Sequence, residues 1–289
     1  MKYYLFSFLT IMFFYQVSGQ NSNKFMGVIK IQDTLIITYK VDFEESNGII
    51  SGYSLTDFGG EHETKSRIEG KYDNVRNLLS FKEVELIYTK STFSEEDFCN
   101  IHLEPIKFKI GSNKLMGSFK GLFNDGTECI SGEIAMNSVE RIDKRVSKFT
   151  KQIEKSNRVP DSLKLKLKNT KLLDTINLNV LKKNETTSII TRAKTLRVAV
   201  YDGGQIDDDI ITIKKNGKTI LSKYRITSER KIIEVNMDAQ KVQLTIHSDS
   251  EGSIGSNTAI VEFVDGINTI KTMTNLKMGE ITRIDLIKK

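Results

Sequence analysis

The chain has 289 residues, of which 38% are hydrophobic and 28% are charged, and it contains no tryptophan and two cysteines. This length suffices for two ordinary domains with a buried core each, and the polar balance is typical of β-sheets with one face in water. No segment after the first twenty residues is apolar enough to cross a bilayer, which excludes a membrane-spanning mature chain.

The net charge of +6 is distributed unevenly along the chain. Residues 1–137 hold 14 Lys and Arg against 18 Asp and Glu, residues 138–195 hold 15 against 6, and residues 196–289 hold 14 against 13. The basic character therefore belongs almost entirely to the middle segment. These shifts predict four regions: a signal peptide at 1–19, a β domain at 20–137, a basic connector at 138–195 and a second β domain at 196–289.

The first nineteen residues have the three parts of a secretory signal peptide. Lys2 supplies the positive start, an apolar run extends from Tyr3 to Tyr15, and Val17-Ser18-Gly19 offers small residues before a cleavage point. We expect export to the periplasm or the medium, with a mature chain that begins near Gln20. A retained anchor helix is the alternative interpretation.

Residues 20–137 alternate between apolar and polar residues with the period of a β-strand. In "TLIITYKVDF", Leu35, Ile37, Tyr39, Val41 and Phe43 share one face. The pattern predicts eight strands joined by short turns, which favours sequential antiparallel pairing as a closed barrel or a sandwich. The predicted strands are 25–32, 34–43, 48–56, 63–72, 77–88, 99–110, 113–121 and 128–136.

Two details of this segment can be checked against a structure. The apolar positions change parity around Pro105 in the sixth predicted strand, which indicates a β-bulge. Cys99 and Cys129 open the sixth and eighth strands, which run in the same direction in a meander. An even cysteine count in an exported protein predicts that these two form a disulfide across or beside the seventh strand.

In outline, the eight-stranded meander resembles the lipocalin- or avidin-type calycins. The resemblance is one of architecture, because the Gly-x-Trp signature of lipocalins is absent. It implies an alternative function, the carriage of a small apolar ligand inside the barrel. Inward residues would then line the cavity, or would equally fill a solid core; they are Leu35, Ile37, Tyr39, Val41, Tyr53 and Leu55.

The connector begins with "SVERIDKRVSKFTKQIEKSNRVP", which predicts an amphipathic helix with Ser138 as its N-cap and its end before Pro160. Ile142, Val146, Phe149 and Ile153 recur at helical spacing, and this face is expected to bury Phe149. Lysine and arginine fill the other face. Lys144, Arg145, Lys148 and Lys151 are the candidate contacts to an anionic surface such as lipopolysaccharide or an acidic glycan. The alternative is a solvated linker and one amphipathic helix docked on a neighbouring domain. Nucleic acid is not expected as a partner, since Phe149 is the segment's one aromatic residue.

Residues 196–289 return to strand periodicity and predict a β-sandwich of seven or eight strands. Asn216-Gly217 marks a two-residue hairpin. The segment resembles a small β-sandwich module found in secreted and outer-membrane-linked bacterial proteins. The residues that carry the resemblance are an acidic turn with Asp202, Asp207 and Asp209, the Asn216-Gly217 hairpin, Asn257-Thr258-Ala259 and Asp265-Gly266.

The acidic turn "YDGGQIDDDII" is a candidate calcium site, because several carboxylates on one flexible loop suit this hard cation. Asp202, Asp207 and Asp209 are the expected ligands. The alternative is a solvated turn whose aspartates accept backbone N–H groups.

The sequence gives little support for catalysis. Glu83 and Glu85 could in principle serve a carboxylate-based hydrolase, but the pattern predicts that both face water, with Val84, Leu86 and Tyr88 buried on the other face. The three histidines lack zinc-ligand spacing, and no nucleophile or phosphate-binding motif is present. The expected function is therefore a non-enzymatic, exported binding module at the bacterial cell envelope, whose partner is an envelope protein or an acidic surface.

Overall fold

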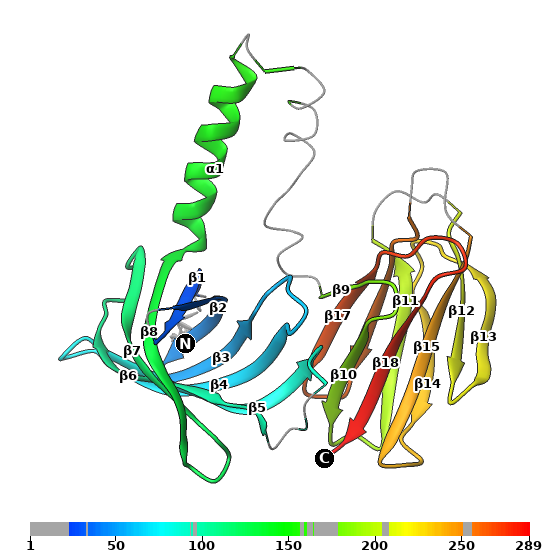
Figure 1. The fold of residues 1–289 in the computed structure, drawn as a ribbon, viewed down its shortest axis with the longest axis horizontal. Coiled ribbons are helices and arrows are strands. Elements are labelled where there is room, and N and C mark those ends of the chain that lie inside the picture. The colour runs from blue at the N-terminus through cyan, green and yellow to red at the C-terminus, as the bar shows by residue number, and fades with distance from the viewer. Residues whose placement is uncertain are drawn as a thin grey trace, which may run out of the picture.

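The computed structural model describes residues 23–32, 34–92, 94, 97–156, 159–160, 164, 179–203, 208–250 and 256–289 (Figure 1). The predicted signal peptide and Gln20 lie outside the described residues. Within these ranges the fold is all-β with a single helix, and it confirms an eight-stranded antiparallel unit and a second β unit joined by a helix-containing segment.

The eight strands of the first unit form a closed barrel in which every neighbour is antiparallel, and β1 pairs with β8 to complete the ring. All eight predicted strands are confirmed to within a few residues at each end. They are β1 (Asn23–Ile31), β2 (Leu35–Ser46), β3 (Ile49–Thr56), β4 (Thr64–Asp73), β5 (Leu78–Thr89), β6 (Asn100–Lys107), β7 (Lys114–Leu122) and β8 (Glu128–Ser138).

Glycines allow the sharp bends that closure requires. A Cβ at Gly52 of β3 would lie 2.1 Å from the carbonyl oxygen of Asp42, and a Cβ at Gly70 of β4 would lie 2.1 Å from that of Ser80. The predicted bulge near Pro105 is also confirmed. Between the Leu79–Ile106 and Phe81–Leu103 pairings, β6 advances by three residues while β5 advances by two, so β6 contains one extra residue.

The barrel interior is filled by its own side chains, as expected for eight strands. Phe25, Phe43 and Phe108 pack ring against ring, with centroids 5.6–6.3 Å apart, at the end from which the helix leaves. The other members of this core are Ile29, Ile31, Tyr39, Val41, Ile50, Ile68, Tyr72, Leu79, Phe81, Ile101, Leu103, Leu115, Phe119, Ile134 and Met136.

Helix α1 (Val139–Glu154) continues directly from β8 and projects away from both β units (Figure 1). Ser138 is its N-cap, as predicted, and its hydroxyl accepts the N–H of Arg141 at 3.3 Å. Glu140 in the first turn and Lys151 in the last turn complement the helix dipole. The main contacts of α1 with other named elements are those to β1 and β8 at its base.

The second unit is a sandwich of two five-stranded sheets. One sheet has the order β13 (Lys218–Arg225), β12 (Ile210–Lys215), β15 (Lys241–Ser250), β18 (Ile281–Lys288) and β10 (Thr186–Thr191). The other has the order β14 (Lys231–Asn236), β11 (Thr195–Asp202), β16 (Ala259–Val264), β17 (Thr269–Thr274) and β9 (Asn179–Leu181). Strands β9 and β10 precede residue 196, so the sandwich takes in the last part of the predicted connector.

The barrel and the sandwich share a continuous sheet, because β5 pairs with β10 through Thr89–Ser188 and Tyr88–Ile189. Ile87 and Tyr88 of the barrel belong to the hydrophobic core of the sandwich. Lys90, whose side chain is only 3% exposed, donates to the carbonyl of Val180 at 2.8 Å. The two units therefore meet in a packed seam.

Candidate functional site

The most exposed amphipathic feature among the described residues is helix α1. Its apolar stripe (Ile142, Val146, Phe149 and Ile153) lies along one side of the helix, as the spacing predicts. No residue of α1 is buried, and Phe149 is 60% exposed. The prediction that this face buries Phe149 is wrong, because α1 leaves the barrel at its base and does not lie against either β unit.

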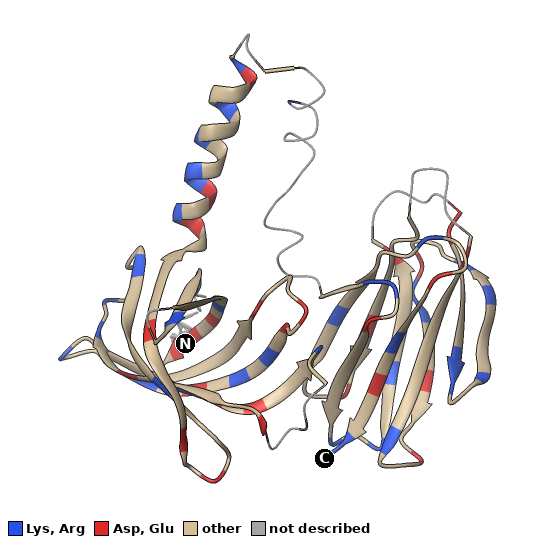
Figure 2. Ribbon diagram, viewed as in Figure 1, with Lys and Arg blue, Asp and Glu red and all other residues tan. Residues whose placement is uncertain are grey.

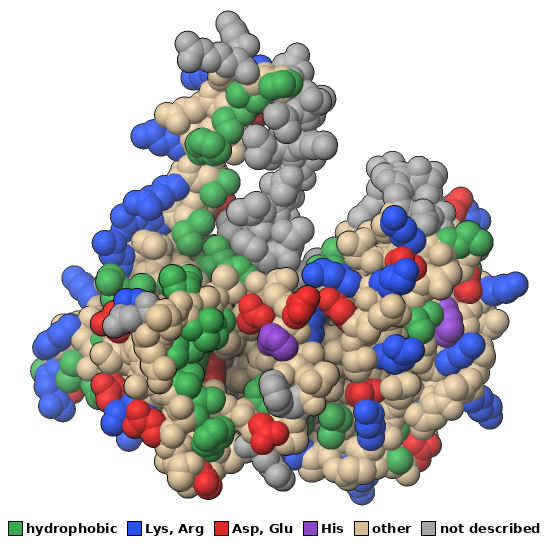
Figure 3. Space-filling view, viewed as in Figure 1, with side chains coloured by type: hydrophobic (Ala, Val, Ile, Leu, Met, Phe, Trp, Pro, Cys, Tyr) green, Lys and Arg blue, Asp and Glu red, His purple; other side chains and the backbone are tan. Residues whose placement is uncertain are grey.

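The four predicted anion contacts, Lys144, Arg145, Lys148 and Lys151, are all exposed on α1 and form its basic stripe. Figure 2 shows cationic residues recurring along the helix, and in Figure 3 they gather on one side while hydrophobic side chains occupy the other. Arg145 lies one turn before Phe149 and so borders the apolar stripe, whereas Lys151 points to the opposite side.

Acidic residues occupy the remaining flank of α1. Glu140, Asp143 and Glu154 follow one another on the side away from Arg145, at the angles that 3.6 residues per turn dictates. The helix thus has an apolar, a basic and an acidic sector. An anionic surface would attract the basic sector and repel the acidic one, so the helix has a preferred rotation about its own axis at such a surface.

The base of α1 borders a hollow in the protein surface. This hollow has a volume of about 440 Å³ and is lined by β1, the β6–β7 turn and the first residues of the helix, including Phe25, Ile110 and Ser138. It is open to solvent and lies at the barrel end closed by the phenylalanine cluster, so the candidate surface is continuous from the helix to the barrel rim.

The structure places Glu83 and Glu85 on opposite faces of β5, which contradicts the predicted shared face. One extra residue of β5, Val84, lies between the Ile68–Glu83 and Arg67–Glu85 pairings, and this bulge reverses the direction of the side chains. Glu85 lies outside, paired with Arg67 and with Arg192 of the sandwich at 3.0 Å each. The predicted carboxylate pair is therefore not brought together.

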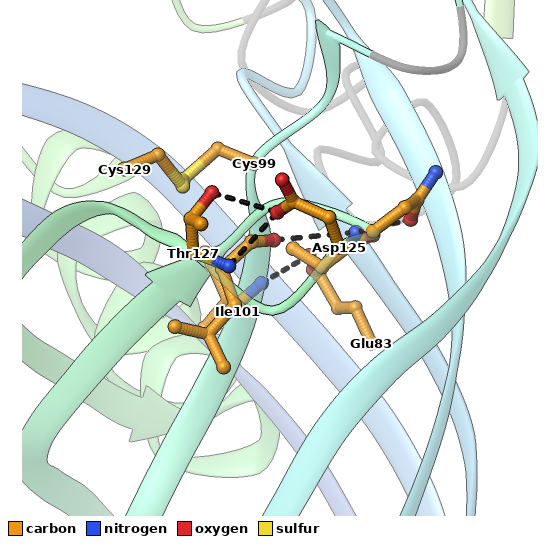
Figure 4. Close-up of a disulfide and its surroundings, with 9 residues drawn as sticks. Glu83, Cys99, Ile101, Asp125, Thr127 and Cys129 are labelled. Atoms are coloured by element: carbon orange, nitrogen blue, oxygen red, sulfur yellow. Dashed lines mark hydrogen bonds between the residues drawn. A yellow bond between two sulfur atoms is a disulfide. The ribbon is translucent and has the colours of Figure 1, made fainter.

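Glu83 lies inside the barrel, where it is 6% exposed. It accepts a hydrogen bond from the Ile101 N–H at 2.8 Å (Figure 4). It also accepts from the Ser54 hydroxyl at 2.5 Å and the Tyr39 hydroxyl at 3.1 Å. Burial raises the pKa of Glu83 above its ordinary value, and these hydrogen bonds oppose part of the rise. Burial, and then the charge of Glu83, raise the pKa of Tyr39 well above its usual value.

The predicted disulfide is confirmed. Cys99 and Cys129 are bonded, with their Cα atoms 6.1 Å apart (Figure 4). The bridge passes over β7 at Gly121, where an added Cβ would lie 2.3 Å from Cys99 Sγ. The Cys129 end is fixed by a tight turn, in which Asp125 accepts from both the N–H and the hydroxyl of Thr127.

The residues named for a ligand cavity separate into two groups. Tyr39 and Val41 are fully buried among the side chains that fill the barrel, while Tyr53 and Leu55 face outward and pack against the sandwich core. Leu35 is 52% exposed at the start of β2. Partly buried Ile37 packs against the same core as Tyr39 and Val41, and the carriage of a ligand in the barrel stays a prediction.

The acidic turn brings two of its three predicted calcium ligands to one end of the sandwich. Asp202 pairs with Ala259, and buried Asp209 accepts the N–H of Thr258 at 2.8 Å. Asp207 lies outside the described residues. Within the part of the chain that the structure describes, three or more metal-ligating side chains do not cluster anywhere. The calcium site stays a prediction.

A calcium site formed by Asp202, Asp207 and Asp209 predicts that millimolar Ca²⁺ raises the melting temperature relative to EDTA, and equal melting temperatures would contradict it.

Asp209→Ala is expected to lower the free energy of unfolding by roughly 1–3 kcal/mol without any metal, because the Thr258 N–H loses its acceptor. The exposed neighbour Asp208, paired with Arg225, is the matched control, with an expected loss under about 1 kcal/mol.

Asn257, another residue of the resemblance to a bacterial sandwich module, is fully buried and ties several loops together. Its side chain donates to the carbonyls of Ile210 and Ser250 and accepts from the Thr274 hydroxyl at 3.1 Å. These contacts give the motif a structural role in the fold.

No family model, curated protein or solved structure matches this chain.

Proposed function

We propose that this chain is a non-enzymatic, exported binding module that attaches to an anionic partner at the cell envelope through helix α1. The observation that carries the proposal is the placement of the basic stripe on a helix that leaves the barrel with no buried residue. The barrel and the sandwich, joined by a packed seam, serve as a rigid base that presents the helix.

Two observations support the export part of the proposal. The disulfide between Cys99 and Cys129 is of the kind that persists in oxidising compartments. The predicted secretory signal at residues 1–19 agrees with that compartment. An envelope that carries lipopolysaccharide or acidic glycans would offer the anionic partner.

Retention on a sulfated, heparin-like resin tests the proposed function. Reversing the four charges of the basic stripe, with Lys144, Arg145, Lys148 and Lys151 each changed to Glu, is expected to lower the eluting salt concentration markedly, because exposed charges act through screened attraction. The matched control reverses four exposed lysines of the sandwich, Lys218, Lys223, Lys231 and Lys277. Equal elution of the two variants would refute the role of α1.

A further inference from the structure

We propose that the anionic partner of α1 is a phospholipid surface, and that the helix lies in the plane of this surface with its apolar stripe inserted between the lipids. This inference rests on the proposed function and names its partner. The juxtaposition that carries it is Phe149, exposed on a projecting helix, beside Arg145.

The apolar stripe exposes more hydrophobic side-chain surface than is expected of a helix that contacts only solvent. Phe149 is 60% exposed, and Ile142, Val146 and Ile153 are only partly covered along the same side. Burying a phenylalanine side chain away from water is favourable, in proportion to the apolar area removed from water. Contiguous exposed apolar side chains rimmed by charges mark an interaction surface.

The charges on α1 indicate an anionic surface as its partner. Helix α1 carries five cations, and Lys155 follows at its C-cap, against three carboxylates between Glu140 and Glu154. Arg145 borders the apolar stripe, so its guanidinium can reach lipid phosphates while its stem lies against the acyl boundary. On the other flank, Asp143 would be repelled, and the helix is therefore expected to roll toward its Arg145 side.

The dimensions fit a helix that lies on a membrane. At 1.5 Å per residue, the 16 residues of α1 extend about 24 Å. Within the described residues, the chain forms no helix with the length and apolar character needed to traverse a bilayer. Helix α1 projects past the barrel and the sandwich (Figure 1), so most of its length is held away from both β units.

Insertion makes a prediction that simple charge attraction does not make. With the apolar stripe in the lipid, Arg145 lies at the headgroups and Lys151 points to water. Arg145→Glu should then weaken vesicle binding much more than Lys151→Glu, whereas both substitutions should affect the sulfated resin about equally. This pair of variants has the same charge change on the same helix.

The experiment uses the mature chain and a single-tryptophan probe, since the natural sequence has no tryptophan. In Phe149→Trp, the emission is expected to shift to the blue on mixing with vesicles of equal phosphatidylglycerol and phosphatidylcholine, and not with phosphatidylcholine alone. The matched control is Val75→Trp, a turn residue of the barrel that is 87% exposed, which should not shift. Phe149→Ser should lower vesicle partitioning at least about tenfold.

Each outcome is decisive. A blue shift with the anionic vesicles alone, together with the Arg145–Lys151 difference, supports the proposal. Retention on the sulfated resin without a shift leaves the proposed function standing and overturns lipid insertion, and loss of both refutes the two together. An equal shift with neutral vesicles overturns the anionic partner. A shift on raising protein concentration without lipid shows that a second copy covers the stripe instead.

Discussion

Replacing Glu83 with alanine is expected to lower the free energy of unfolding by roughly 3–5 kcal/mol. The substitution leaves the Ile101 N–H and the hydroxyls of Tyr39 and Ser54 facing the apolar interior of the barrel, and it also leaves a cavity. Denaturant unfolding measures the effect. Glu69→Ala is the control, because this side chain is 51% exposed in a surface pair with Arg67 and should contribute under about 1 kcal/mol.

Glu83→Gln is expected to cost far less than the alanine change. The amide oxygen can accept from the Ile101 N–H, as Oε2 does now, while the amide NH₂ donates to the hydroxyls of Ser54 and Tyr39, which rotate to accept. The glutamine amide can therefore keep a hydrogen bond to each of the three partners, and it cannot ionise.

This pair of variants makes the pH dependence of stability testable. Burial raises the folded-state pKa of Glu83, so the folded protein keeps a proton that the unfolded chain releases above the ordinary carboxyl pKa of about 4.3. The stabilisation is complete below that value and is lost as pH rises through the folded pKa. The slope in between is at most about 1.4 kcal/mol per pH unit. Glu83→Gln should abolish this fall.

The difference in unfolding free energy between the wild type and Glu83→Gln, measured from pH 4 to 8, is the quantity to plot. A difference independent of pH would show that Glu83 does not titrate in this range with a raised pKa. Tyr39→Phe offers a second check. The Tyr39 hydrogen bond lowers the folded-state pKa of Glu83, so removing that hydroxyl should extend the pH-dependent fall to higher pH while its start stays at the unfolded pKa.

The parts of this fold that follow from local patterns are predictable from the sequence. Period-two alternation locates all eight barrel strands, and the parity change at Pro105 locates a bulge. Asn216-Gly217 adopts the two positive φ angles, 47° and 83°, of the expected hairpin turn. Helix α1 begins at the predicted cap, where the Ser138 hydroxyl accepts the N–H of Arg141.

The position of Glu83 was predicted incorrectly, although the sequence contains a signal for it. Leu79 and Phe81 are apolar at odd positions, whereas Val84 and Leu86 are apolar at even ones, so the parity changes within the strand as it does at Pro105. When the apolar pattern of the even-numbered positions is continued back toward residue 81, Glu83 falls on the face exposed to water. Extending the odd phase forwards to the bulge at Val84 assigns it correctly to the interior.

Features that depend on long-range pairing could not be predicted. The continuous sheet through β5 and β10 joins residues about a hundred positions apart, and nothing local marks Thr89 and Ser188 as partners. The exposure of Phe149 was missed for a related reason. The helical pattern shows which side of α1 is apolar but not whether another part of the chain reaches it, and the projection of α1 from the barrel decides that.

Removing the disulfide is expected to lower the free energy of unfolding by about 3–4 kcal/mol, because the bridge closes a loop of 30 residues that the reduced unfolded chain leaves open. Cys99→Ala together with Cys129→Ala tests this by denaturant unfolding. Reductant should reproduce the loss in the wild type and leave the double variant unchanged. An equal effect of reductant on both would mean that the loss does not come from the bridge.

Gly121 provides the sharper test, because it joins the disulfide to the packing of β7. A Cβ there would lie 2.3 Å from Cys99 Sγ and 2.5 Å from the Ile130 side chain, so Gly121→Ala must displace the bridge, its neighbour or the strand. Alanine in a strand otherwise stabilises relative to glycine by roughly 0.5–1 kcal/mol. Gly121→Ala should therefore destabilise the oxidised wild type and cost clearly less in the variant without cysteines. Equal costs in both backgrounds would place the clash on Ile130 alone, and a lower cost without the cysteines would show that the glycine is needed for the disulfide to cross β7.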